Sequence, residues 1–541
     1  MLKKISVLAV IILLMLSALI FQTYKIEGII DVSQYGVVSG SKDASSDNLR
    51  IVNKLIRRAD ESATVVFGEG TYYFDTDIFG GISVKNKKDI TINGKNTVFV
   101  NTSYSPIVAD IESYNKSNII KIIDSKNVTI SGICFDYINH TNASGVITDC
   151  VDGYTYFKLF DEYLSNEKNP IEGNEIVYGV NLFDKEGIPQ REFWFDNKIK
   201  NAFQAADKEN GIFKISGNYG NCGNNVCVRF TSGQYACPTI FVQGTSGLCI
   251  ENTTVYTSPS AVVYAPCGNS NFTFSNFSVK PKNKVLFASN EDCIHIKGLK
   301  GSLKLTDCTF EGIGDDALNV HSKAAVIKEI DGNIITASEG NSDTDINDMW
   351  AKKGDAVEFF DKSFNSFGTA KVVSIKNGKI KLDNIPPDVG KNYILQNVSF
   401  NPDVTIDNCV VNRGRARGFL IQSANANITN CTIRNIGLSA ILAAPDINSW
   451  YEVGSVKNLN IFNNSFVNCG TMQTSHSSGV VTVSLNHDGM TVPETEAVHG
   501  NISINNNIFK NTLTTKEIYI RAAENVKINN NILDKNIIDV K

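Results

Sequence analysis

A short phrase recurs along this chain and constrains its fold more than any other feature. It consists of an apolar residue, a spacer, Asn or Asp, a small or polar residue, and another apolar residue. The phrase begins at Ile250, Phe274, Leu305, Ile406, Ile428, Ile461, Ile504 and Ile528. Self-similarity of this kind is the signature of a solenoid, in which each repeat contacts only its neighbours. In a parallel coil the apolar residues stack inward, and Asn at the bend pairs with backbone and with its equivalent one rung away.

This pattern predicts an all-β chain, a right-handed parallel β-helix that occupies residues 29–541 as one domain. The repeated Asn and Asp are 22–43 residues apart, except that 101 residues separate Asp307 from Asn408. The long interval and alternating runs such as residues 372–382 predict hairpins, and so an inserted β-barrel-like module at residues 324–396. A second non-repeating stretch predicts another inserted antiparallel β-module at residues 146–235.

The N-terminal part of the chain predicts export and a cap. Lys3 and Lys4 precede an apolar run, so residues 1–28 are expected to be a signal peptide or an anchor. The protein should then be secreted, periplasmic or at the cell surface, with any membrane attachment through this segment alone. Residues 46–48 are predicted to cap a helix over residues 49–59, which would cover the first coil and protect an open sheet edge.

Charge and cysteine usage narrow the function further. A net charge of −5 and a pI near 5.8 provide no basic field, so no nucleic-acid partner is expected. Cys308, Cys409 and Cys431 occupy the same place in the repeated phrase and are predicted to form a buried row of thiols. Cys222 and Cys227, in a loop-like stretch, are predicted to form a disulfide.

Two similar segments carry acids at matching places. Residues 292–296 align with residues 316–320, 24 residues later, and the strands that begin at Ser260, Arg417 and Ser439 continue the alignment. Asp292, Asp316 and Arg417 should therefore share one column on successive rungs, with Asp315 beside them. Alternation along a strand then places His295, Asn319 and His321 on the outer face, in an exposed cluster.

Stacked acids are costly because neighbouring rungs are only about 4.8 Å apart. Carboxylates at that spacing repel one another unless one of them holds a proton. A single Asp before a strand often does no more than bond its local backbone. The group of Asp292, Asp315 and Asp316 together predicts catalysis.

The same residues carry a family resemblance. The stretches that begin at Asn290, Gly312, Asn412 and Trp450, with the barrel-sized insertion between the second and the third, resemble glycoside hydrolase family 110, the exo-α-1,3-galactosidases. The resemblance covers nearly the whole chain after residue 28. It implies metal-free, inverting hydrolysis of a terminal α-1,3-linked galactose on blood-group-B-like or linear α-galactosyl glycans.

These considerations give one expected site without cofactor or metal. A glycoside hydrolase needs one carboxylic acid to protonate the leaving oxygen, and an inverting enzyme needs a carboxylate to activate water. Asp292, Asp315 and Asp316 are expected to fill these roles, and the sequence leaves open which is the acid and which is the base. Side chains expected to bind the glycan substrate are His295, Asn319, His321, Arg415, Arg417, Trp450 and Glu452.

Two other interpretations of the sequence stay open. A polygalacturonase-like hydrolase or a polysaccharide lyase shares the fold, but a galacturonate needs a cationic pocket, which only Arg413, Arg415 and Arg417 could supply. A lyase of this fold usually needs calcium ligands or a lone basic residue, and no dense acidic calcium loop is evident. A non-catalytic β-helical adhesin or carbohydrate-binding protein is the second alternative. It would be favoured if the acids were buried with no access.

Overall fold

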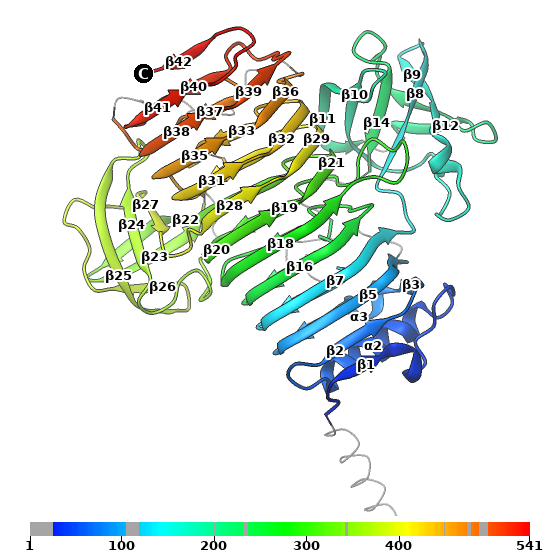
Figure 1. The fold of residues 1–541 in the computed structure, drawn as a ribbon, viewed down its shortest axis with the longest axis horizontal. Helices are drawn as coiled ribbons and strands as arrows, with labels where there is room; N and C mark the ends of the chain where they lie inside the picture. Colours follow the sequence, from blue (N-terminus) through cyan, green and yellow to red (C-terminus); the bar gives the residue numbers. More distant parts are fainter. Residues whose placement is uncertain are drawn as a thin grey trace, which may run out of the picture.

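The computed structural model describes residues 25–103, 118–199, 201–230, 236–340, 345–447, 449–472, 478–485 and 496–541. The chain winds into a long coil of parallel strands (Figure 1). One sheet of the coil, here called the site sheet, pairs each strand in parallel with the next. Its strands are β4 (Ile82–Lys85), β6 (Ile120–Ile123), β15 (Ile240–Gln243), β17 (Val263–Ala265), β19 (Ile294–Lys297), β22 (Leu318–Asp331), β30 (Phe419–Gln422), β33 (Ile441–Ala443), β37 (Val481–Val483), β40 (Ile518–Ile520) and β42 (Ile538–Val540).

The rest of the coil is a second sheet of 18 parallel strands, the long sheet. Buried aliphatic and aromatic side chains fill the space inside the coil as one continuous core. The prediction of a mostly β chain built on a parallel β-helix is confirmed. Strands of the long sheet are β1 (Ile29–Asp31), β2 (Thr64–Phe67), β3 (Gly70–Phe74), β5 (Lys88–Asn101), β7 (Lys126–Tyr137), β16 (Ser246–Val255), β18 (Asn269–Val279), β20 (Leu299–Thr306), β21 (Thr309–Ile313), β28 (Asp403–Asp407), β29 (Val410–Gly414), β31 (Asn425–Thr429), β32 (Thr432–Ile436), β35 (Asn458–Phe462), β36 (Ser465–Cys469), β38 (Asn501–Asn505), β39 (Ile508–Lys510) and β41 (Val526–Asn529).

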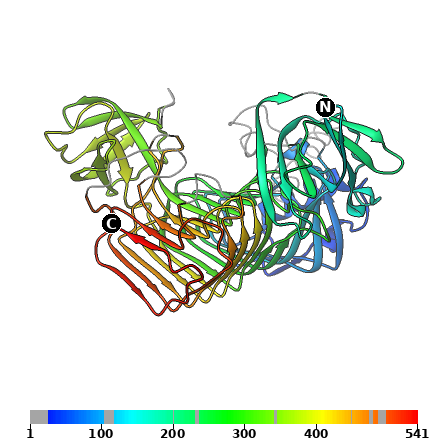
Figure 2. The ribbon, with the colours of Figure 1, turned by 90° about the horizontal axis from the view of Figure 1, so that it is seen from above.

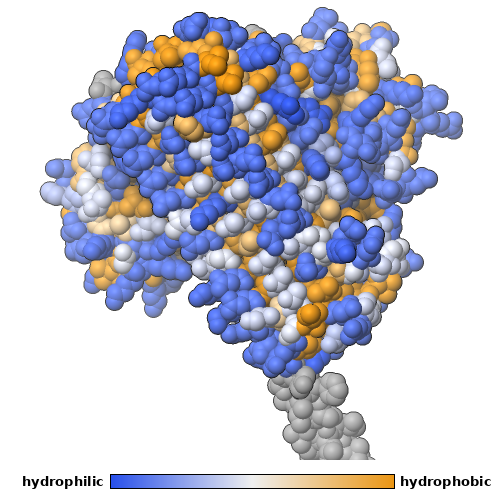
Figure 3. All heavy atoms as spheres, in the orientation of Figure 1, coloured by the Kyte–Doolittle hydropathy of each residue, from blue (hydrophilic) through white to orange (hydrophobic). Residues whose placement is uncertain are grey.

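The repeated Asn or Asp explains why the phrase recurs. In all eight phrases this residue has φ between 48° and 58°, the left-handed region that Asn and Asp tolerate better than other residues with a side chain. Each coil therefore bends at the same place. Their side chains also bond along the solenoid: Asn276 Nδ2 donates to Asn252 Oδ1 at 2.9 Å, and Asn463 Nδ2 to Asn430 Oδ1 at 2.8 Å. Mostly hydrophilic side chains cover the face of the molecule that is seen in Figure 3.

A helix lies at the N-terminal end of the coil. Helix α2 (Ser45–Arg58) buries Leu49, Val52, Leu55 and Ile56. It begins earlier than predicted and has no side-chain cap, because its N-cap residue is Ala44; Asn48 lies within the helix and bonds the Val38 backbone. A short helix, α3 (Thr76–Phe79), follows β3. Most of the predicted export segment, residues 1–28, lies outside the described residues. Among the described residues no helix is both long and apolar enough to span a membrane.

Two antiparallel units interrupt the coil. Figure 2 shows both of them projecting from the same side of the solenoid. Each unit has its own buried cluster of apolar side chains. The first unit consists of β8 (Asn142–Val151), β9 (Tyr154–Leu159), β10 (Val177–Phe183), β11 (Pro189–Ile199), β12 (Phe203–Asp207), β13 (Ile212–Ser216) and β14 (Asn225–Arg229). The second consists of the C-terminal half of β22 with β23 (Ile334–Glu339), β24 (Ala356–Phe360), β25 (Ser366–Lys376), β26 (Lys379–Leu382) and β27 (Ile394–Asn397).

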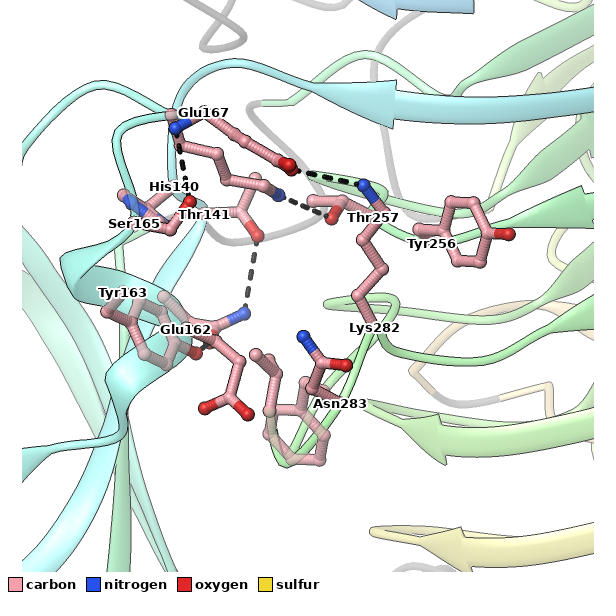
Figure 4. Close-up of a pocket in the computed structure, with 14 residues that line it drawn as sticks. His140, Thr141, Glu162, Tyr163, Ser165, Glu167, Tyr256, Thr257, Lys282 and Asn283 are labelled. Carbon is pink, nitrogen blue, oxygen red and sulfur yellow. Dashed lines mark hydrogen bonds and ion pairs between the residues drawn. The ribbon is translucent and has the colours of Figure 1, made fainter. Parts of the chain in front are cut away.

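Polar contacts fasten the first unit to the solenoid, around the pocket shown in Figure 4. Lys168 Nζ lies 3.0 Å from Asp136 Oδ1 and donates to Thr257 Oγ1 at 3.0 Å. Lys282 Nζ lies 3.4 Å from Glu167 Oε2. These contacts join residues that follow β8 and β9 to the long sheet. They help to fix where the first unit stands relative to the coil.

The cysteines bear out one prediction and contradict another. Cys308, Cys409 and Cys431 are buried and unpaired, as the repeat position predicts. The predicted disulfide between Cys222 and Cys227 is wrong, since both are free thiols. Cys227 lies in β14 and packs in a small apolar cluster of Phe183, Leu286 and Phe287, whereas Cys222 lies in the turn before that strand.

A row of buried Asn side chains lies next to the repeated bends, and it allows a first prediction, on stability. Asn464 is buried; its Oδ1 accepts from Cys431 N at 2.8 Å, and its Nδ2 donates to Ile428 O at 2.9 Å. Asn464→Ala removes the side-chain partner of both buried backbone groups, so the free energy of unfolding should fall by about 2–4 kcal/mol. Asn460 makes only an exposed bond to Asn427. Asn460→Ala, the control, should cost less than about 1 kcal/mol in urea unfolding; equal losses would contradict this account.

Candidate active site

Successive rungs of the site sheet bring the predicted acids together. Asp292 precedes β19, Asp316 precedes β22 and Arg417 precedes β30. Cys293 N donates to Asp316 O at 2.9 Å, so the first two residues are neighbours across rungs. The predicted alignment of these strands, with Ser439 on the next rung, is confirmed by the pairing of Ile294 with Leu318, Leu318 with Phe419 and Phe419 with Ile441. The alignment of Ser260 is wrong by one residue, because Val263 pairs with Ile294.

The acid side chains bond the backbone of the next rung. Asp292 Oδ1 accepts from Asp316 N at 2.9 Å, and Asp316 Oδ1 accepts from Arg417 N at 2.9 Å. The Arg417 guanidinium ends the column, with Nη1 3.4 Å from Asp316 Oδ2. Each carboxyl group is thus held by an amide donor one rung further along the coil.

The cluster is buried and not exposed as predicted. The Asp292 and Asp316 side chains are 8% and 2% exposed, whereas Asp315 is 33% exposed. The prediction failed because segments from outside the site sheet contact this face. Glu452, on β34 (Glu452–Val453), reaches it because β34 pairs antiparallel with β22. Glu192, on β11 of the first antiparallel unit, contacts the same face through its ion pair with Arg415.

Two histidines continue the network from Asp292. His295 Nδ1 lies 2.8 Å from Asp292 Oδ2, and His295 Nε2 lies 3.2 Å from His321 Nε2. The other ring nitrogen of His321, Nδ1, lies 2.9 Å from Ser322 O and donates to it. Glu452 Oε1 is 3.6 Å from His295 Nε2 and 3.4 Å from His321 Nε2.

Asn319 completes the buried end of the site. Its Nδ2 donates to Glu452 Oε2 at 3.2 Å. Its Oδ1 is buried and has no hydrogen-bond partner among the described residues. A buried acceptor without a donor is costly, and a ligand hydroxyl would satisfy it.

Arg415 links the acids to the first antiparallel unit. Its Nη2 lies 2.7 Å from Asp315 Oδ1, its Nη1 lies 2.6 Å from Glu192 Oε2, and its Nε donates to Gly314 O. Its guanidinium carbon also lies 5.2 Å from the ring centroid of Trp194. Trp450, predicted to offer a ring face to the sugar, is 64% exposed and takes part in none of the contacts described for this cluster.

Sequence reasoning missed Glu192 and Trp194. They lie about 100 residues before the acids, in a stretch without the repeat that aligned the other residues. One signal was present: the two residues are two apart in an alternating run, so they share one face of a strand.

Burial shifts the proton affinities of the central groups. It is the main cause that raises the pKa of Asp292 well above its usual range, and the negative charge of Asp315 adds to it. Burial likewise raises the pKa of Asp316, against the lowering effect of Arg417. Burial lowers the pKa of His295 to about 4 and that of His321 well below its usual value. Both histidines are therefore neutral near pH 7.

Two groups of side chains are spaced closely enough to hold a cation. They are Asp292 with Asp315 and Asp316, and His295 with His321 and Glu452; in each group, ligand atoms lie within 4.8 Å of one another. The protein's own contacts already engage these atoms, through the backbone amides, Arg415, Arg417 and Asn319. The expectation of a metal-free site therefore stays a prediction.

Comparison with known proteins supports a glycosidase. The chain is 21% identical over 496 residues to α-1,3-galactosidase B of Bacteroides thetaiotaomicron, covering 84% of this chain and 78% of the relative. It is 24% identical over 480 residues to α-1,3-galactosidase A of Akkermansia muciniphila, covering 84% and 75%. It is 23% identical over 330 residues to α-1,3-galactosidase B of Parabacteroides distasonis, covering 57% and 53%. The predicted resemblance to family 110 is confirmed. No protein-family model matches the chain.

Solved structures with a similar course of the chain were also found. The family 28 exopolygalacturonase of Yersinia enterocolitica has 11% identity and a TM-score of 0.39, covering 93% of this chain and 78% of that one. The A-module of the mannuronan C-5 epimerase AlgE6 of Azotobacter vinelandii has 10% identity and a TM-score of 0.38, covering 93% and 99%.

The raised pKa of Asp292 leads to a second prediction. Because the folded state favours the protonated carboxyl, its contribution to stability is present below the unfolded pKa of about 3.9 and is lost as the pH rises above it. Asp292→Asn cannot ionise. It should match the parent in thermal unfolding near pH 4 and exceed it by about 1 kcal/mol or more at pH 7.

The matched control is Asp315→Asn. This change removes one of the two carboxylates that pair with the buried Arg415, so the variant should be less stable than the parent at pH 7. If the stability of Asp292→Asn varied with pH as that of the parent does, burial would not be raising the pKa of Asp292.

Proposed function

We propose that this protein is an exported glycosidase that hydrolyses terminal α-1,3-linked galactose from glycans. The observation that carries the proposal is the cluster of Asp292 with Asp315 and Asp316, which lie on two successive rungs. It belongs to a chain whose relatives are named α-1,3-galactosidases. An acid with a raised pKa beside another carboxylate is the arrangement that glycoside hydrolysis needs.

The chemistry requires a carboxylic acid that protonates the leaving oxygen and a carboxylate that activates water or attacks the sugar. Nearest oxygens of the three acids lie within 4.8 Å of one another. Inverting enzymes usually separate their two carboxyl groups by about 6.5–9.5 Å, and retaining ones by about 5–5.5 Å. Inversion is therefore proposed from the family resemblance alone. Three acids allow more than one pairing, and the titrations of Asp292 and Asp316 depend on their neighbours.

The buried end of the site suits a neutral sugar. His295, His321, Asn319 and Glu452 converge there with nitrogen and oxygen atoms that hydroxyl groups can bond. The unsatisfied Oδ1 of Asn319 is an acceptor ready for a sugar hydroxyl. We place the galactose at this end, with Arg415 and Arg417 holding the acids and contacting the sugar beside them.

We also propose the details of the architecture that the sequence predicts. The solenoid of residues 29–541 is right-handed, and helix α2 caps its first coil. The two antiparallel units correspond to the inserted modules at residues 146–235 and 324–396. Residues 1–28 direct export or anchor the chain.

A galacturonan hydrolase is less compatible with the charges at the site. Arg413 pairs with Glu311 at 2.9 Å, Arg415 with Asp315 and Glu192, and Arg417 with Asp316. These three guanidinium groups are already neutralised and offer no free cationic pocket for a uronate carboxylate. A purely adhesive role fits poorly with Asp315, whose side chain is one-third exposed and so reachable by substrate.

The third prediction concerns turnover. Asp292→Asn, Asp315→Asn and Asp316→Asn each remove one ionisable carboxyl and should lower kcat by roughly 10²-fold or more, the usual reach of general acid–base catalysis. The readout is kcat on an α-1,3-galactoside beside a thermal melt that shows a folded variant. Near-parental kcat in all three would mean that the site is elsewhere.

Substrate class and stereochemistry can be tested together. With matched α-1,3-, α-1,4- and α-1,6-galactosides and a galacturonan, we expect free galactose from the α-1,3 linkage and no cleavage of galacturonan. Proton NMR of the first product should show the β-anomer if the reaction inverts. An initial α-anomer would establish retention, and an unsaturated product would establish a lyase.

The fourth prediction concerns metal. Exhaustive dialysis against EDTA should leave kcat/KM unchanged, because the atoms of both candidate cation groups are engaged by the protein itself. Metal content measured on the same sample is the control. A loss of activity restored by one divalent ion would place a cation in the site.

A further inference from the structure

We propose that Trp194 forms the binding surface for the sugar on the leaving-group side of the scissile bond. The ligand would be a neutral pyranose that lays its C–H face on the indole. This inference rests on the proposed function and extends it, because nothing in the sequence pattern or the comparisons assigns this residue a role.

The ring of Trp194 is held in place from several sides. On β11 it pairs with Gly179 of β10 and its ring packs against that glycine, where a Cβ atom would lie 3.4 Å away, an ordinary van der Waals distance. The guanidinium carbons of Arg229 and Arg415 lie 4.8 and 5.2 Å from its ring centroid, within cation–π distance. Arg229 is fully buried, and its Nε and Nη1 have no hydrogen-bond partner among the described residues, so the ring is one of its few partners.

The ring is also tied to the acids. Arg415, which contacts it, lies 2.7 Å from Asp315 and 2.6 Å from Glu192, two residues before the tryptophan on β11. A hydrogen bond from Trp194 to Glu192 joins Arg415 in lowering the pKa of this carboxyl, against burial. The first antiparallel unit therefore presents one fixed aromatic side chain beside the most exposed acid.

The exposed fractions of the side chains show which end of the site is closed and which end faces solvent. The His321 and Asp292 side chains are 3% and 8% exposed, Asp315 is 33% exposed, and Trp194 is 47% exposed. An enzyme that removes a terminal sugar places that sugar at the closed end and leaves the remaining glycan toward solvent. The next sugar then lies by Asp315 and Trp194. A half-exposed indole with a fixed orientation offers the apolar face that a pyranose packs against.

The experiment compares two substrates with one glycone. An α-1,3-linked galactose disaccharide has a sugar as its leaving group, whereas α-galactosyl fluoride has no ring there. Trp194→Ala should lower kcat/KM on the disaccharide by at least about tenfold and leave that on the fluoride within about twofold. Trp194→Phe keeps an aromatic face and should fall between Trp194→Ala and the parent on the disaccharide. A thermal melt of each variant shows that it is folded.

Two further variants sharpen the comparison. Val151→Ala changes an exposed side chain elsewhere on the same unit and should match the parent on both substrates. Trp450→Ala tests the other exposed tryptophan, and a larger disaccharide-specific loss there would overturn the assignment to Trp194.

Other outcomes are equally decisive. Equal losses of Trp194→Ala on both substrates would show that the ring only positions Arg415 and the acids. No loss on either substrate would exclude a binding role. Both results would sink this inference while leaving the proposed function intact. If the parent enzyme hydrolyses neither galactoside, the proposed function itself fails, and this inference fails with it.

Discussion

The hydrogen bond that each stacked acid accepts from the backbone amide of the next rung is the interaction on which the site depends. Parallel strands lie about 4.8 Å apart, which would place like charges in contact. Asp292 and Asp316 each accept from a backbone amide one rung along, and Arg417 ends the column with a cation. The same regular spacing that builds the coil therefore both crowds the carboxyl groups and supplies donors that keep them in place.

The coil alone leaves this column as an open surface, and the two irregular parts of the chain turn it into a site. Glu452 arrives on a short strand that pairs with β22, and Glu192 arrives on β11 of the first antiparallel unit. The Glu452 carboxylate contacts the two histidines at one end of the site, and the Glu192 carboxylate contacts Arg415 at the other end. The site is thus closed at the His321 end and open at the Asp315 end.

The repeat makes one part of this structure predictable from the sequence. The left-handed Asn and Asp bends, the buried cysteine row and the alignment of Asp292, Asp316 and Arg417 all depend on contacts between neighbouring coils, which a period reveals. Burial of the acids, the role of Glu192 and the free state of Cys227 depend on units without a period. No local pattern in those units says which face of the coil they contact. The one-residue error at Ser260 has no such cause, because Val263 follows Ile250 at the same distance along the chain as Leu318 follows Leu305.

Burial of the two stacked acids lowers the stability of the folded chain and at the same time suits one of them to act as a general acid. Removing water from Asp292 and Asp316 raises their pKa, so at neutral pH holding them ionised destabilises the folded chain. The same shift keeps a proton on the carboxyl at a higher pH than an ordinary Asp would hold it, as a general acid requires. Arg415 and Arg417 limit that destabilisation, and the same ion pairs neutralise the positive charges of the two guanidinium groups. A ligand that enters meets hydroxyl-bonding atoms, and the guanidinium groups of Arg415 and Arg417 beside them are already paired with carboxylates, which favours a neutral sugar over a uronate.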